Sequence, residues 1–197
     1  MQSAPTLVIE NLALARGDRT LFEGFSLCMS AGEVVHLTGR NGAGKTSLLE
    51  AIAGLRAPES GTVQAPAPEH THWIGHKNGL HPALSAVENL QFWCGLSGVD
   101  AAGISPTLDR LQLKAARHRP GRTLSTGQKR RVALARLLLA RRLWWLLDEP
   151  LAGLDVQGAA LFAELVAEHR AAGGAVLLTS HQALPAVCGP VRDVTLT

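Results

Sequence analysis

One stretch of eight residues has the types and spacing needed to bind nucleotide phosphates. Gly39-Arg40-Asn41-Gly42-Ala43-Gly44-Lys45-Thr46 fits the pattern G-x-x-x-x-G-K-[ST] at every position. Its glycines let consecutive backbone N–H groups turn toward an anion, and the helix expected after the stretch adds the partial positive charge of its N-terminus. We expect Lys45 to reach the β- and γ-phosphates and the Thr46 hydroxyl to bind Mg²⁺. The stretch therefore predicts a phosphate-binding loop.

Two acidic residues follow an apolar run later in the chain. Residues 143–147 have the pattern of a buried strand, and Asp148 and Glu149 come directly after it. Carboxylates at the C-terminal end of a strand lie in the crevice where α/β sheets bind ligands. We expect Asp148 to hold Mg²⁺ through water, and Glu149 to act as general base on the water that attacks the γ-phosphate.

A second anion-binding pattern opens a basic helix. Leu124-Ser125-Thr126-Gly127-Gln128 places a serine and a glycine at an expected helix N-terminus, where backbone N–H groups and a hydroxyl can bind an anion. Because one nucleotide does not need two γ-phosphate sites in one chain, we expect this site to face the nucleotide of a second copy of the chain. The alternative is an ordinary N-cap, in which Ser125 or Thr126 only caps the helix.

Strands and helices in alternation are expected to position these residues. The pattern predicts strands at 6–10, 21–27, 33–38, 62–64, 71–75, 143–147 and 175–179. It predicts helices at 47–53 and 86–93, around 108–111, and at about 126–140 and 157–171. Ser85 and Glu88 have the spacing of a capping box for the second of these helices. The βαβ alternation implies an α/β fold with a parallel sheet.

Length and composition restrict the class of protein. A chain of 197 residues, 46% of them hydrophobic, can form a globular domain with a substantial core. No apolar run approaches the roughly 18 residues that span a bilayer, and residues 1–5 lack the pattern of a signal peptide. The three cysteines are far apart and include no C-x-x-C, which argues for a reducing cytoplasm and against a disulfide framework or a zinc site.

Basic residues are concentrated in one stretch, 114–142, that contains no acid. They are Lys114, Arg117, Arg119, Arg122, Lys129, Arg130, Arg131, Arg136, Arg141 and Arg142. Such a block could bind nucleic acid or anionic lipid. We favour a solvated helix face beside a nucleotide site, because aromatic residues for stacking on bases are missing from the block.

These motifs together resemble the ATP-binding subunit of ABC transporters over almost the whole chain. Residues 39–46 match the Walker A motif and residues 143–149 the Walker B motif. Residues 124–128 look like the family signature L-S-G-G-Q, with Thr126 in place of the first glycine. Leu154-Asp155 matches the D-loop, and His181 matches the switch histidine that contacts the γ-phosphate. Considered alone, His181 would be an ordinary surface histidine.

The resemblance implies a P-loop NTPase fold with a RecA-like core, a small antiparallel β subdomain and a helical subdomain. We expect a single ABC ATPase domain, in which residues 1–76 and 141–197 form the core with the β subdomain and residues of about 77–140 form the helical subdomain with the signature. The implied cofactors are ATP and Mg²⁺, and the implied catalytic residues are Glu149, His181 and Lys45. The implied ATP-binding residues are Gly39, Arg40, Asn41, Gly42, Ala43, Gly44, Lys45, Thr46, Ser47 and Arg16, with Ser125, Gly127 and Gln128 acting on the partner's ATP. Two chains would pair head to tail and sandwich two ATP molecules, and hydrolysis would drive membrane partners.

Besides Thr126, two positions depart from the family pattern in ways that matter for the site. The family usually has a glutamine near the end of the strand at 71–75, where it senses Mg²⁺ and touches the membrane subunit, and this chain has His76 there. A neutral imidazole nitrogen can still accept from a metal-bound water, so His76 is included with Thr46 and Asp148 as a Mg²⁺-site residue. The family also stacks adenine on an aromatic residue where this chain has Arg16, whose guanidinium plane could replace it.

The surroundings of His76 narrow the resemblance to one subfamily. Residues 73–80, 84–90, 130–137 and 179–182 are similar to the haem-exporter ATPase, the A subunit, of the cytochrome c maturation (Ccm) system. That resemblance implies integral membrane subunits B and C as partners, a place on the cytoplasmic face of the bacterial inner membrane, and ATP use for haem export or release of the haem chaperone. The alternatives are an ABC exporter ATPase for another small substrate, and a regulatory or nucleic-acid ATPase, for which fused cassettes or large insertions are missing. No nucleic-acid partner is expected.

Four histidines, His70, His72, His76 and His81, suggest the alternative that the chain binds haem or a metal directly. His70 and His72 would share one face of the strand expected there and could form a two-point ligand. The absence of a C-x-x-C-H motif makes direct haem binding the less favoured reading.

Overall fold

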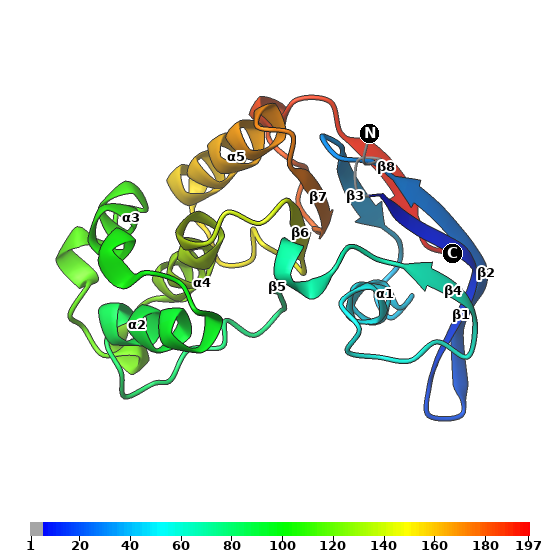
Figure 1. The fold of residues 1–197 in the computed structure, drawn as a ribbon, viewed down its shortest axis with the longest axis horizontal. Helices are drawn as coiled ribbons and strands as arrows, with labels where there is room; N and C mark the ends of the chain where they lie inside the picture. The colour runs from blue at the N-terminus through cyan, green and yellow to red at the C-terminus, as the bar shows by residue number, and fades with distance from the viewer. Residues whose placement is uncertain (1–5) are drawn as a thin grey trace. The chain divides into compact units, whose positions relative to one another are not determined.

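The computed structural model describes residues 6–197, so the expectation about a signal peptide in residues 1–5 lies outside the described residues. The chain divides into two compact units (Figure 1). The first contains the chain up to Gly75, Arg142–Glu149 and Ala163–Thr197. The second contains His76–Arg141 and Pro150–Phe162.

An antiparallel sheet of three strands forms one layer of the first unit. Its strands are β1 (Leu7–Arg16), β2 (Arg19–Met29) and β4 (Ser60–Gln64), in the order β2-β1-β4. Gly17 and Asp18 alone connect β1 to β2, so the predicted strands at 6–10 and 21–27 were too short. Register shifts along β1 interrupt the alternation of inward and outward side chains. The period of two that predicts a strand therefore stops in the sequence before the strand itself ends.

A five-stranded sheet forms the second layer of this unit, and all its pairings are parallel as predicted. The strands are β3 (Val34–Thr38), β5 (Thr71–Ile74), β6 (Trp144–Leu147), β7 (Ala175–Thr179) and β8 (Arg192–Thr195), in the order β5-β6-β7-β3-β8. Strand β8 was not predicted, because as an edge strand it is largely exposed and has a polar sequence.

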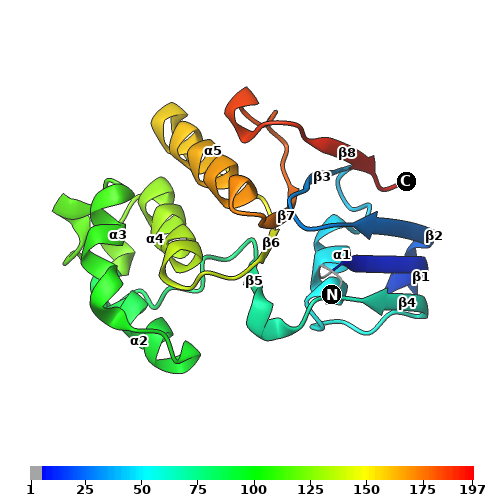
Figure 2. The same ribbon diagram turned by 45° about the horizontal axis from the view of Figure 1, so that its top comes forward.

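Helix α1 (Lys45–Ile52) packs between the two sheets of the first unit (Figure 2). Its buried Leu48 and Leu49 belong to one hydrophobic cluster with Leu12 of β1 and Leu37 of β3. Trp144 of β6 is fully buried in the same cluster. This core holds the start of α1 against the ends of the parallel strands, which is where the predicted chemistry lies.

The second unit is helical. It contains α2 (Ala86–Ser97), α3 (Ile104–Arg110), α4 (Thr126–Leu139) and the first part of α5 (Val156–Ala171), whose last part belongs to the first unit. The capping box before α2 is confirmed: the Glu88 N–H donates to Ser85 Oγ and the Ser85 N–H to Glu88 Oε2. The hydrogen bonds from Ser85 lower the pKa of the Glu88 carboxyl.

Short 3-10 turns occur in both units. They are Pro68–His70, Ala101–Gly103, Lys114–Ala116, Gly121–Thr123 and Ala186–Cys188. No helix within residues 6–197 combines the length and the apolar character that crossing a membrane requires.

Candidate functional site

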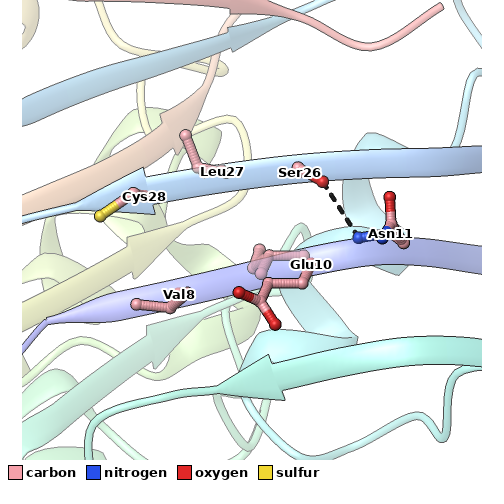
Figure 3. A pocket seen from close by; sticks show the side chains of 7 residues that line it. Val8, Glu10, Asn11, Ser26, Leu27 and Cys28 are labelled. Atoms are coloured by element: carbon pink, nitrogen blue, oxygen red, sulfur yellow. Dashed lines mark hydrogen bonds between the residues drawn. The ribbon is translucent and has the colours of Figure 1, made fainter.

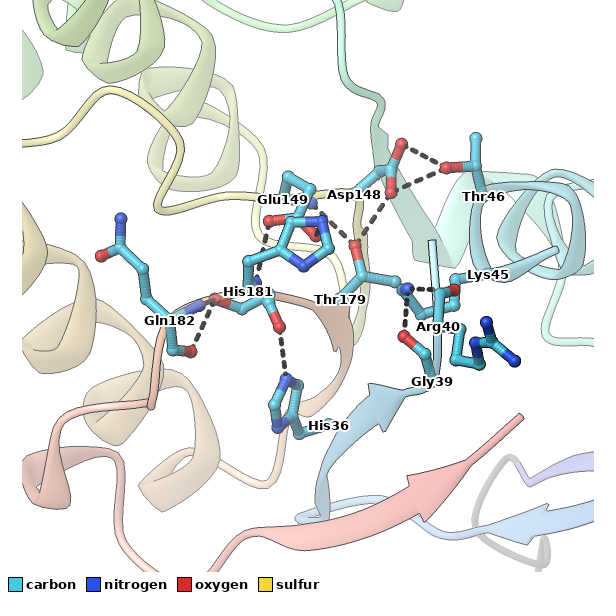
Figure 4. Close-up of polar contacts among 11 residues, drawn as sticks. His36, Gly39, Arg40, Lys45, Thr46, Asp148, Glu149, Thr179, His181 and Gln182 are labelled. Atoms are coloured by element: carbon cyan, nitrogen blue, oxygen red, sulfur yellow. Dashed lines mark hydrogen bonds and ion pairs between the residues drawn. The ribbon is translucent and has the colours of Figure 1, made fainter. Parts of the chain in front are cut away.

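The predicted phosphate loop lies between β3 and α1, in the arrangement that the sequence pattern requires. Lys45, the first residue of α1, turns back over the loop, and its Nζ donates to the carbonyl oxygens of Gly39 at 2.7 Å and Arg40 at 3.1 Å (Figure 4). The lysine charge is thus held at the mouth of the loop. Residues 41–43 connect these two ends, and Ser47 is buried one residue after Thr46.

Gly39 and Gly44 are required by the backbone conformation of the loop. Gly39 has a φ of 136°, and a Cβ there would lie 2.5 Å from the carbonyl oxygen of Leu196. Gly44 has a φ of 100° at the N-cap of α1 and packs against the ring of Phe22. Since Gly44 has no side chain to cap the helix, the first N–H groups of α1 stay available to an anion.

Asp148 joins three elements of the first unit. It follows β6 and is buried, with 2% of its surface exposed. Its carboxylate accepts the Thr46 hydroxyl at 3.0 and 3.1 Å and the Thr179 hydroxyl at 2.9 Å. The P-loop helix, β6 and β7 therefore meet at one carboxylate, and two of the predicted site residues are in direct contact.

Thr46 and Asp148 fit a Mg²⁺ ion by their chemistry. Mg²⁺ prefers oxygen ligands and uses one or two protein groups together with water and substrate phosphates. A hydroxyl and a buried carboxylate within hydrogen-bond distance form such a pair. No group of three or more His, Cys, Asp or Glu side chains suited to a metal occurs among the described residues, so a site here depends on this pair and on phosphate oxygens.

Glu149 and His181 lie side by side beyond Asp148. The His181 N–H donates to Glu149 Oε2 at 3.2 Å, and its Nε2 lies 3.5 Å from Glu149 Oε1. Glu149 has a φ of 52°, an unfavourable conformation for a residue with a side chain. The Thr179 hydroxyl accepts the Glu149 N–H at 2.9 Å and helps to hold that conformation. Such strain is typical of functional positions.

Two residues at this site were missed in the sequence. Thr179 is completely buried and bonds both acidic residues, and His36 on β3 contacts the carbonyl oxygen of Ser180. Both are polar residues inside or at the end of an apolar strand, which is the signal that could have identified them. The sequence pattern indicates that such residues need partners, but it does not indicate which ones.

Ser125 is the N-cap of α4 in the second unit and forms a capping box with Gln128. The Gln128 N–H donates to Ser125 Oγ at 3.1 Å and the Ser125 N–H to Gln128 Oε1 at 3.0 Å. The N-cap that we considered as the alternative for this motif is therefore present. It does not exclude anion binding, because the Ser125 hydroxyl keeps its own proton to donate and the first N–H groups of α4 have no helical partner.

Close packing against Gly153 in the second unit involves both Thr126 and Gly127, and it restricts position 127 to glycine. The methyl group of Thr126 packs against Gly153, where a Cβ would lie 2.6 Å from it. A Cβ on Gly127 would lie 2.7 Å from the Gly153 carbonyl oxygen. The signature and the segment that precedes Leu154-Asp155 are thus in close contact, and only a glycine at 127 permits it.

Arg16 and His76, which also depart from the family pattern, lie outside these networks. Arg16 is the exposed last residue of β1, where it pairs with Arg19 across the hairpin. His76 is exposed and is the first residue of the second unit. The loop after His76 is anchored to α4 in that unit, since Arg130 donates to Asn78 Oδ1 and Arg136 to the Gly79 carbonyl oxygen.

The proposed two-histidine ligand has the wrong geometry for one face of a strand. His70 lies in the 3-10 turn Pro68–His70 and is exposed, whereas His72 lies in β5 and is buried. Pro68 starts a turn there, and the strand begins only at Thr71. The expectation that the two side chains share a strand face was therefore wrong.

From the sequence we favoured a solvated helix face for the basic block at 114–142. The structure shows that only part of this block is exposed to solvent. Arg130 is buried and donates to the Pro150 carbonyl oxygen, and Arg131 donates to that of Leu111. Burial lowers the pKa of Arg136. Much of the block's charge therefore stabilises backbone carbonyl groups, and fewer cations are presented to solvent than the sequence count suggests.

A hollow of about 440 Å³ lies between β1 and β2 (Figure 3). It is lined by Val8, Ile9, Glu10, Asn11, Ser26, Leu27 and Cys28. The Asn11 N–H donates to Ser26 Oγ beside it, at the irregular part of β1. None of the predicted site residues lines this hollow.

Comparisons with known proteins agree with the geometry of the loop and the carboxylates. The model of the family described as "ABC transporter" matches residues 22–152. A protein of Hyphomonas neptunium named cytochrome c biogenesis ATP-binding export protein CcmA is 44% identical, and the match covers 93% of each chain. A protein of the same name from Rhodobacter capsulatus is 45% identical over 89% of this chain and 80% of its own length.

A solved structure shares the fold. A solved structure from Pyrococcus furiosus, provisionally assigned as the ATP-binding protein of an ABC transporter, superposes with a TM-score of 0.82. The superposition covers 97% of each chain at 24% sequence identity. The predicted α/β fold of the ABC ATPase type is confirmed.

Proposed function

The chain belongs to the ABC transporter family, and from that premise we propose that it is the ATP-hydrolysing subunit of a membrane complex for cytochrome c biogenesis. As an ABC ATPase domain it binds nucleotide. One observation supports hydrolysis most strongly: the contacts that join Thr46 to Asp148, and Glu149 to His181, beside the phosphate loop. They bring together hydroxyl, carboxylate and imidazole groups suited to phosphoryl transfer.

In this proposal the loop and Lys45 hold the phosphates. The ammonium group, which donates to the carbonyl oxygens of Gly39 and Arg40, lies where it can exchange them for phosphate oxygens. Thr46 and Asp148 would hold Mg²⁺, which when bound neutralises charge on the β- and γ-phosphates. The N–H groups at the start of α1 orient the phosphate chain.

Glu149 would take the proton from the attacking water, since its carboxylate lies next to Asp148 in the chain, is only 15% exposed and is in contact with His181. His181 would donate to the γ-phosphate, as the residue that Glu149 already contacts. The buried Thr179 gives the two acidic residues different surroundings. Its hydroxyl donates to the side chain of Asp148 and accepts from the backbone N–H of Glu149, so the Glu149 carboxylate stays free of this contact.

We propose that the second half of each ATP site comes from another copy of the chain. Ser125, Gly127 and Gln128 would act on the partner's ATP, and two chains would pair head to tail. The Ser125 hydroxyl proton and the first N–H groups of α4 support this role. The helical subdomain that we propose to carry this half-site covers residues of about 77–140, within one ABC ATPase domain of residues 1–197.

The proposed membrane partners are subunits of the B and C type, bound at the cytoplasmic face of the bacterial inner membrane. The relatives are named ATP-binding export proteins of cytochrome c biogenesis, which supports a place in an export complex. The B and C subunits and the membrane face come from the subfamily resemblance alone. His76 and Arg16 would contribute to Mg²⁺ sensing and to adenine stacking. Co-purification of the chain with its membrane partners, followed by haem analysis of the complex, tests the substrate. A haem-free complex that exports another small molecule would favour the general exporter instead.

Replacement of Glu149 by Gln tests the proposed hydrolysis directly. We expect Glu149→Gln to bind ATP, to lose turnover by at least about 100-fold, and to accumulate as a dimer in ATP, because the amide cannot accept the proton. Turnover by phosphate release and mass by analytical ultracentrifugation measure these effects. Glu164→Gln is the control, since Glu164 is exposed on α5. Normal hydrolysis by Glu149→Gln would remove Glu149 from the mechanism.

A further inference from the structure

His36 connects the outer strand of the parallel sheet to the loop that carries His181. It lies on β3, three residues before the phosphate loop, and 13% of its side chain is exposed. Its Nδ1 is 2.9 Å from Asp193 Oδ1 on β8, and its Nε2 is 3.0 Å from the Ser180 carbonyl oxygen (Figure 4). The mechanism proposed above gives this histidine no role.

Both contacts of the ring are with hydrogen-bond acceptors. A carboxylate and a carbonyl oxygen can only accept, so both ring nitrogens must donate for both contacts to be favourable. The Nδ1 contact orients the ring, and the Nε2 contact then directs an N–H at the backbone of Ser180. An unpaired lone pair at Nε2 would instead face the carbonyl oxygen.

Ser180 connects this contact to the loop after β7, residues 180–182, which contains His181. Ser180 is buried, and its hydroxyl accepts the Gln182 N–H at 3.0 Å and donates to the Gln182 carbonyl oxygen at 2.8 Å. His181 lies between these two residues and donates its N–H to Glu149. A shift of the Ser180 carbonyl therefore moves the His181 backbone relative to Glu149.

Other charged groups around His36 have their own partners. On β8, Arg192 bonds the Glu33 carboxylate at 2.7 Å. From α5, Arg170 donates to the Gly32 carbonyl oxygen. Strand β7 presents Leu178 opposite His36, and the next titratable side chain beyond β7, His181, lies against Glu149. Asp193 is therefore the charged group that orients the His36 ring.

We propose that His36 is a positioning residue for ATP hydrolysis, which holds the Ser180 carbonyl and thereby sets His181 against Glu149. The inference rests on the proposed roles of Glu149 and His181. It makes β8 a functional element, since Asp193 orients the ring from there. The same strand leads to Leu196, whose N–H donates to the Thr38 carbonyl oxygen beside the phosphate loop.

Two substitutions separate the two contacts of His36. In His36→Gln the side-chain amide can replace Nε2 and still donate to Ser180, whereas in His36→Asn it can replace only Nδ1 and reach Asp193. We expect kcat to fall about tenfold in His36→Asn and less than threefold in His36→Gln, with the Kd for ATP unchanged within twofold in both. His118→Leu is the control, because His118 is an exposed histidine of the second unit. If β8 pairing alone mattered, His36→Asn would be the milder change.

A spectroscopic measurement tests the inference without turnover. In full-length protein labelled with ¹⁵N-histidine, the ring signals of His181, assigned with His181→Gln, should shift in His36→Asn and stay in place in His36→Gln. Asp193→Asn, at an exposed position, should give an intermediate shift. Unchanged His181 signals and wild-type kcat in both His36 variants would overturn the proposal. Failure of the proposed hydrolysis would appear separately, as normal turnover in Glu149→Gln.

Discussion

At the scale of single residues, two buried polar side chains, Asp148 and Thr179, hold the acidic part of the site together. Thr179 illustrates this, since one hydroxyl donates to Asp148 and accepts from the Glu149 N–H. In the low-dielectric interior such a group is costly to leave without its partners. The two acidic residues, which are adjacent in sequence, thus receive different surroundings from the same threonine.

Substitution of Thr179 should therefore reduce both stability and catalysis. Thr179→Val keeps the shape but removes both hydrogen bonds, and we expect the free energy of unfolding to fall by about 1–3 kcal/mol and kcat to fall with it. Urea denaturation and phosphate release measure the two effects. Thr179→Ser retains the hydroxyl and is the control. Equal stability of the Val and Ser variants would show that the hydrogen bonds of Thr179 contribute nothing measurable.

At the scale of elements, helix boundaries were predicted best where the hydrophobic pattern and a capping residue indicated the same start. The α2 capping box of Ser85 and Glu88 and the start of α4 at Thr126 were both predicted correctly. The phosphate loop was also placed correctly between a strand and a helix, because its glycines have conformations that only glycine adopts easily.

The missing parts depend on contacts that are distant in the chain. Strand β8 has no apolar pattern, and only pairing with β3 defines it. Asp193 meets His36 across 157 positions of sequence, and Thr179 meets Asp148 across 31. A local pattern can indicate that a buried polar residue needs a partner, but the fold determines the partner.

Helix α5 contains a half-buried histidine, His169, that should make stability depend on pH. The His169 ring stacks on Trp145 with centroids 3.8 Å apart, and its Nε2 contacts the Leu143 carbonyl oxygen. Burial lowers the pKa of His169 below its ordinary value of 6.5, although backbone hydrogen bonds oppose the shift. Below about pH 6.5 the unfolded chain therefore binds the proton more readily than the folded chain, and folding loses stability.

We expect the free energy of unfolding to decrease from pH 6.5 downward until the folded-state pKa of His169 is passed. Above pH 6.5 this contribution is constant. His169→Gln, which keeps a donor for the Leu143 carbonyl oxygen, should be less stable at neutral pH but should lose less stability on acidification. Urea denaturation between pH 5 and pH 8 measures the slopes, with His118→Gln as the exposed control. Parallel curves for wild type and His169→Gln would contradict the assignment.

At the scale of the whole molecule, the phosphate loop and the signature belong to different compact units of one chain. The proposed head-to-tail dimer would use the two as halves of one site. The capping box of Ser125 is compatible with this use, because the cap takes the oxygen lone pair and leaves the hydroxyl proton. A structural and a ligand-binding role can therefore coexist at Ser125, and a single substitution there would confound them.

Two matched serines of the second unit can separate these roles. Ser85 and Ser125 both cap a helix through a capping box, so Ser125→Ala should cost about 1 kcal/mol of stability. Ser85→Ala should cost at least as much, because the Ser85 hydroxyl is buried and also donates to Glu88 Oε2. In a Glu149→Gln background, only Ser125→Ala should also weaken ATP-dependent dimerisation, by about tenfold, because only it removes a donor to the partner's ATP. Analytical ultracentrifugation with and without ATP measures the dimer. Equal weakening by both substitutions would assign the effect to stability alone, and normal dimerisation of Ser125→Ala would exclude the proposed contact between Ser125 and the nucleotide of the second chain.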